Sequence, residues 1–64
     1  MKKKDLLKVL KDYNFVFVRS NGHMIYSNGT ITVAVPNHME HSRGLVRRLL
    51  TQAGLNKEEI RKYI

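Results

Sequence analysis

The sequence predicts an α+β domain in which two helices cover one face of a three-stranded antiparallel sheet, followed by a short C-terminal helix. Three observations support this prediction. Apolar residues recur at helical spacing in two segments, 3–13 and 43–53. Three short runs rich in β-branched and aromatic residues lie between these segments. Each run is followed by a turn signal made of Asn, Gly or Pro. The predicted order is therefore α-β-β-β-α with a terminal helix.

The first helix is predicted between Lys3 and Tyr13, where apolar residues recur three and four positions apart and charged residues lie between them. Asp5 in the first turn suits the positive end of the helix dipole. Asn14 tolerates the left-handed backbone conformation, so we expect the helix to stop there.

The two later helices have recognisable ends. Ser42 is the predicted N-cap of the second helix, because its hydroxyl can accept a hydrogen bond from a backbone N–H of the first turn. Gly54 follows the last apolar position and is the predicted stop. Asn56, with Glu59 three residues later, predicts an Asn variant of the capping box that opens a short last helix through Tyr63.

Three strands are predicted at 15–18, 23–26 and 30–35, and Pro36 ends the third. Asn28-Gly29 is a strong signal for a two-residue hairpin turn between the last two strands.

Such a turn would fix how these two strands pair and which face each side chain takes. It places Ser27 opposite Thr30, Met24 opposite Val33, and His23 opposite Ala34. The expected core-face residues are then Met24, Tyr26, Ile31, Val33 and Val35, and the expected exposed residues are His23, Ile25, Thr30, Thr32 and Ala34. His23 is accordingly predicted to be solvent-accessible, near a sheet edge.

Length and charge restrict the class of protein. A chain of 64 residues predicts one small domain spanning 1–64. Twelve Lys and Arg against five Asp and Glu give a formal net charge of +7, which favours a polyanionic partner.

The chain has no cysteine, so we expect neither a disulfide nor a thiolate metal site. We also expect a cytoplasmic location. No apolar run is long enough for a membrane span, and we expect no targeting segment.

Histidine is the best candidate for chemistry in this chain, which has no GxSxG motif and no phosphate-cradling glycine loop. An imidazole can take a proton from a ribose 2′-hydroxyl or give one to the leaving 5′-oxygen. His23 is preferred because it follows Asn21-Gly22, which tolerate positive φ and let a phosphate backbone approach. An isolated strand histidine is, however, often only a packed or solvated residue. His38 is expected to anchor a loop or to contact substrate, and His41 is expected to be solvated. We expect no metal site.

Several other residues are candidates for RNA contacts. Arg19 is predicted to lie near His23 across the turn, where its charge could stabilise a reacting phosphate. The complete set of expected RNA-binding residues is Arg19, Asn21, Gly22, His38, Arg43 and Arg47.

With these residues in place, the chain resembles the HicA toxins, the small ribonuclease half of a bacterial toxin–antitoxin pair. The resemblance covers almost the whole chain. It rests on the lysine-rich first helix, the Phe15-Val16 strand, the run from Arg19 to Tyr26, Val35-Pro36-Asn37-His38, and Gly44 before a basic helix that leads into Gln52-Ala53-Gly54-Leu55. Asn14 and Asn21 stand where the family usually has glycine.

The resemblance implies a double-stranded-RNA-binding-like fold and metal-independent cleavage of mRNA that arrests translation, without a cofactor. It places the family's catalytic histidine on His23, as general acid or base, and implies a cognate HicB-type antitoxin that covers the active site. Two alternatives stay open at this point: a non-catalytic RNA-binding module of the same fold, and a basic domain that binds an acidic protein.

Overall fold

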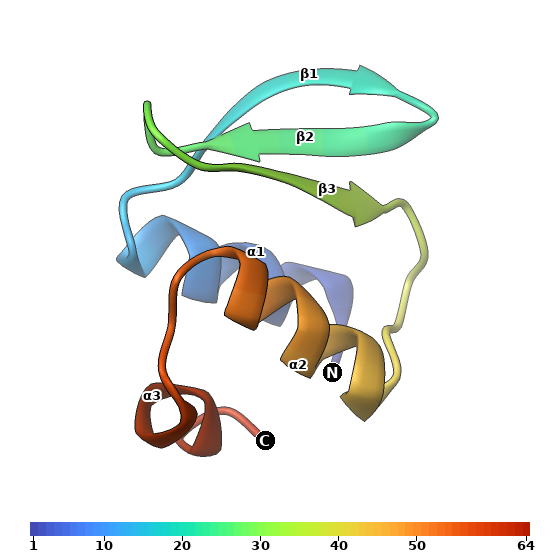
Figure 1. Cartoon of the computed structure of the whole chain (residues 1–64). Helices are drawn as coiled ribbons and strands as arrows, with labels where there is room; N and C mark the ends of the chain where they lie inside the picture. Colours follow the sequence, from blue (N-terminus) through green and yellow to red (C-terminus); the bar gives the residue numbers. More distant parts are fainter.

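The computed structural model describes all residues, 1–64, and has two layers (Figure 1). Its elements are α1 (Lys3–Asp12), β1 (Val16–Asn21), β2 (His23–Ser27), β3 (Thr32–Pro36), α2 (Arg43–Gln52) and α3 (Lys57–Arg61). The antiparallel strands form one sheet in the order β1-β2-β3. Helices α1 and α2 lie against one face of this sheet, and α3 lies on the far side of the helical layer. The predicted α-β-β-β-α order and terminal helix are therefore confirmed.

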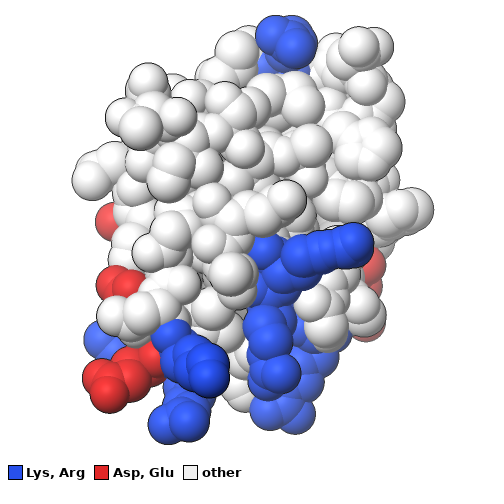
Figure 2. Space-filling model, in the orientation of Figure 1, with Lys and Arg blue, Asp and Glu red and all other residues white.

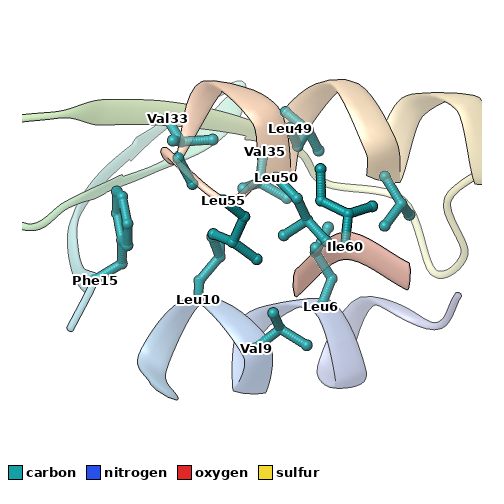
Figure 3. Packing of buried hydrophobic residues seen from close by; sticks show 12 residues of the cluster. Leu6, Val9, Leu10, Phe15, Val33, Val35, Leu49, Leu50, Leu55 and Ile60 are labelled. Atoms are coloured by element: carbon teal, nitrogen blue, oxygen red, sulfur yellow. The ribbon is translucent and has the colours of Figure 1, made fainter. Parts of the chain in front are cut away.

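The hydrophobic core fills the space between the sheet and the two long helices (Figure 3). Leu6 and Leu10 of α1 point toward Val33 and Val35 of β3, and Leu50 of α2 closes the same cluster. All five side chains are at most 1% exposed. Since each fully buried aliphatic side chain contributes about 1.5–3 kcal/mol, this cluster holds the two layers together.

The predicted helix ends are present. Asn14 has φ 69° and Gly54 has φ 96°, so both residues after the long helices adopt the left-handed conformation. The Ser42 hydroxyl accepts a hydrogen bond from the Leu45 backbone N–H at 3.2 Å. The first helix ends one residue earlier than predicted, at Asp12.

The capping box before α3 is also complete. The Asn56 side chain accepts from the Glu59 N–H at 2.9 Å, and the Glu59 carboxylate accepts from the Asn56 N–H at 2.8 Å. The short helix is therefore fixed at its start by two reciprocal hydrogen bonds.

The predicted pairing of β2 with β3 is wrong by two residues. His23 pairs with Pro36, and Met24 pairs with Val35, so the connection is a four-residue loop, 28–31, rather than a two-residue turn. The Asn28 side chain explains the longer loop, because its Oδ1 accepts from the N–H groups of Thr30 and Ile31 at 2.9 and 2.7 Å. A shift of two residues leaves each side chain on its predicted face, since strand side chains alternate with a period of two.

The face of the sheet away from the helices is called the open face below. Val33 and Val35 are buried on the helix side, while His23, Thr32 and Ala34 are exposed on the open face, as predicted. His23 is not at a sheet edge as predicted, because β2 is the central strand; it lies at the end of that strand.

Strand β1 is longer than predicted and contains a β-bulge. It begins at Val16 and continues through Asn21, and its register with β2 shifts between Phe17 and Arg19. Phe17 pairs with Tyr26, whereas Arg19 pairs with Ile25, the neighbouring residue of β2. The bulge therefore changes which face the rest of β1 presents.

Candidate functional site

The centre of the candidate site is the tight connection between β1 and β2. Asn21 pairs directly with His23, so Gly22 alone separates the two paired residues. Gly22 has φ 79°, in the region that glycine adopts without cost. The predicted left-handed tolerance of Asn21 is not used, because Asn21 lies within the strand and Asn14 is the one non-glycine residue with positive φ. His23 is exposed at this end of the open face.

The end of β3 and the loop after it lie beside His23. Pro36 is the partner of His23 in the sheet, and His38 follows two residues later. The His38 backbone N–H donates to the Pro36 carbonyl oxygen at 2.9 Å, which turns the chain sharply after the strand. The His38 side chain is exposed. The structure thus brings the segment containing His38 to the same end of the sheet as His23.

His41 was expected to be solvated, and this expectation is wrong: only 3% of the residue is exposed. Its Nε2 lies 2.7 Å from the Pro36 carbonyl oxygen, and because a carbonyl only accepts, Nε2 carries the proton. Its Nδ1 is buried without a partner. The rings of His41 and His38 contact edge to face, with centroids 6.3 Å apart.

The backbone of His41 is tied to the N-terminal segment as well. Its N–H donates to the Met1 carbonyl at 2.8 Å, and the Met1 ammonium donates to the His41 carbonyl at 2.9 Å. His41 therefore links the N-terminal segment to the end of β3, and it helps to hold that end in place beside His23.

Arg19 shares the open face with His23. Its partner Ile25 is two residues along β2 from His23, so Arg19 lies diagonally across from His23, a separation that a long side chain can bridge. Arg19 is also the one Lys or Arg among the twelve that lies in a strand. This register is consistent with the prediction that Arg19 lies near His23.

Arg43 and Arg47 lie elsewhere. Both belong to α2, on the layer below the sheet, and they line a groove between α2 and α3 together with Lys57 and Arg61. Figure 2 shows basic side chains gathered over the helical half of the molecule, whereas the sheet half in the same view is almost free of charge. The structure therefore divides the expected RNA-binding residues between two surfaces.

Lys57 and Arg61 were not among the predicted site residues. Their four-residue spacing repeats that of Arg43 and Arg47, and this was the one signal in the sequence that could have pointed to them. Nothing in the sequence indicates that the two pairs face the same groove, because this depends on how α3 folds back onto α2.

None of the three helices has the combination of length and apolar character that crossing a lipid bilayer requires. The chain also contains no group of three or more His, Asp or Glu side chains placed to hold a metal ion.

Comparison with known proteins gives one match. The family model described as the HicA toxin of bacterial toxin–antitoxin matches residues 4–55, which include the whole sheet, the whole of α2 and all of α1 except Lys3. No curated protein and no solved structure matches the chain. Helix α3 lies outside the matched residues.

Proposed function

The chain belongs to the HicA toxin family of bacterial toxin–antitoxin systems, and we propose that it is an endoribonuclease that cleaves mRNA and so arrests translation. His23 is the proposed general acid or base. The observation that carries the proposal is the position of His23, exposed at the end of the open face and directly after the Gly22 turn. This position leaves the imidazole free to reach a phosphodiester.

The proposed reaction uses the ribose 2′-hydroxyl of the RNA itself. The 2′-oxygen loses its proton and attacks the adjacent phosphorus, the bond from phosphorus to the 5′-oxygen breaks, and the departing 5′-oxygen gains a proton. The products are a 2′,3′-cyclic phosphate and a 5′-hydroxyl end, and no metal ion or cofactor enters the balance. His23 would carry one of the two proton transfers.

The remaining side chains of this surface support binding. Arg19 lies diagonally across from His23 and would stabilise the negative charge that builds on the phosphate. Asn21 and Gly22 form the turn along which the RNA backbone would pass, and His38 would contact it from the loop after β3. DNA lacks the 2′-hydroxyl, so we expect cleavage to be specific to RNA.

A toxin of this family has a cognate antitoxin partner. We propose that the partner here is a HicB-type protein and that it inhibits by covering His23. The open face supports this proposal because no part of the chain's own fold lies over it (Figure 1).

The decisive experiment compares the wild type with His23→Ala, both in purified form and during induced expression. We expect His23→Ala to lose about 10²–10⁴-fold in cleavage rate, the contribution typical of a general acid or base. RNA binding should persist, because His23 is exposed and its removal leaves the core intact. Growth arrest should disappear with cleavage.

Four outcomes would contradict the proposal. Equal cleavage by His23→Ala would remove the role of this residue. Products with 5′-phosphate ends would exclude attack by the 2′-hydroxyl. RNA binding without cleavage by the wild type would instead indicate an RNA-binding module, and binding insensitive to salt would indicate a partner other than a phosphate backbone.

A further inference from the structure

A groove of about 860 Å³ lies between α2 and α3, on the opposite side of the helical layer from His23's open face. It is called the α2–α3 groove below. Its lining residues are Arg43, Arg47, Thr51, Leu55, Asn56, Lys57, Ile60, Arg61 and Ile64. Four of these are cations, and no acidic residue is among them.

The cations form two matched pairs, one on each wall. Arg43 and Arg47 are four residues apart on α2, and Lys57 and Arg61 are four residues apart on α3. Residues at this spacing lie one above the other on a helix, about 5–6 Å apart at Cβ. Each wall therefore presents two positive charges along the length of the groove, which is the arrangement that a chain of successive phosphates would match.

The neighbouring carboxylate does not neutralise the groove. Glu59 belongs to α3, but its side chain turns back to accept the hydrogen bond from the Asn56 N–H at the start of that helix. Arg43 donates a hydrogen bond to the Ile64 carbonyl oxygen at 3.3 Å, whereas the side chains of Arg47, Lys57 and Arg61 are exposed and have no hydrogen-bond partner within the protein. These three cations are therefore free to bind an external anion, and Figure 2 shows Lys and Arg side chains at the surface of the helical half.

The floor of the groove favours a phosphate backbone over a protein segment. Leu55 and Ile60 are only 5% and 6% exposed, so among the hydrophobic lining residues only the half-buried Ile64 offers apolar surface to an incoming side chain. Binding sites for protein segments depend on apolar or aromatic anchors placed in pockets. The other accessible lining residues are the four cations with the polar Thr51 and Asn56.

We propose that the α2–α3 groove is a second nucleic-acid site, which binds the sugar–phosphate backbone of RNA flanking the cleavage point through charge alone. The proposal rests on the proposed function in taking RNA as the ligand. The first turn of α2, the end of β3 and the β1–β2 turn lie at one end of the molecule, so one RNA strand can pass from the groove to His23 (Figure 1). Five of the nine lining residues, including Lys57 and Arg61 of α3, lie beyond the residues that the family model matches.

The test uses single-stranded DNA and 2′-O-methyl RNA of one sequence, which have no free 2′-hydroxyl to react. Since contacts to phosphate carry no information about the sugar, both probes should bind with affinities within a few-fold of each other. The variant Arg47→Gln with Arg61→Gln removes one cation from each wall. We expect its affinity to fall at least tenfold at low salt. The slope of log K against log salt should fall by about 1.4, at about 0.7 per lost phosphate contact.

The matched control is Arg48→Gln with Lys62→Gln. It removes the same charge from the same two segments, but both residues are exposed and neither lines the groove. We expect its affinity to stay within about threefold of the wild type. Circular dichroism should show the wild-type fold for both double variants.

The proposal is overturned if the two double variants bind alike, if the wild type binds neither probe, or if an oligoglutamate peptide binds the groove more tightly than either probe. Binding is measured with probes that cannot be cleaved, so a failure of the groove proposal can be told apart from a failure of the proposed reaction. A wild type that binds both probes but cuts no RNA would leave the groove standing while removing the ribonuclease. If the wild type cuts RNA while the groove variants bind the probes normally, the ribonuclease would stand and the groove proposal would fall.

Discussion

Phe17 and Arg19 lie on opposite faces of the sheet although they are two residues apart in one strand. In a regular strand residues i and i+2 share a face. Here Phe17 pairs with Tyr26 and contacts its ring edge to face at 5.7 Å, while Arg19 pairs with Ile25 on the open face. The bulge between them produces this reversal, and it is what puts the one basic residue of the sheet beside His23.

Arg19→Ala is expected to lower the rate of RNA cleavage at least tenfold, because a charge aimed at the reacting phosphate is lost. Arg19→Lys should recover part of the rate, since the charge returns without the planar guanidinium. Single-turnover cleavage of a defined RNA measures both. Arg48→Ala is the control, an exposed arginine of α2 that should stay within about twofold of wild type. If Arg19→Ala cleaved as fast as this control, Arg19 would have no part in the reaction.

Gly22→Ala is expected to lower the free energy of unfolding by about 1 kcal/mol, because an L residue is strained at φ 79°. A Cβ at this position would meet no atom within 4 Å, so the cost comes from the backbone alone. Gly44→Ala provides the matched control.

Gly44 also has open space around its missing Cβ, but it lies in α2 and has no positive φ. Alanine there should raise the free energy of unfolding by about 0.5 kcal/mol. Denaturant unfolding measures the free energy of unfolding of both variants. Equal effects of the two substitutions would show that backbone strain does not cause the loss of stability at Gly22.

His41→Ala is expected to lower the free energy of unfolding by about 2 kcal/mol, since it removes a buried ring and its hydrogen bond to Pro36. His38→Ala, which removes an exposed ring of the same loop, should change it by no more than about 0.5 kcal/mol. Thermal or denaturant unfolding measures both. Similar effects of the two substitutions would contradict the structural role of His41.

The order of the elements, and the faces of β2 and β3, could be predicted from the sequence alone. Helix ends at Asn14, Ser42 and Gly54 depend on local backbone and side-chain chemistry, so they could be predicted and are present. The exposed face of His23 was also predicted correctly, although the pairing was wrong, because an error of two residues in register preserves the alternation of side chains.

Which residues share a surface could not be predicted and became clear only from the folded structure. The hydrogen bonds of Asn28 lengthened the loop and moved Pro36 to His23. His41 became buried because the N-terminal segment and the end of β3 meet around it. The bulge brought Arg19 to the open face. Helix α3 folds back onto α2 and forms a basic groove with it, away from the open face. The Asn28 hydrogen bonds are local, but the other features depend on how separate elements pair or pack, and local propensity carries no information about such contacts.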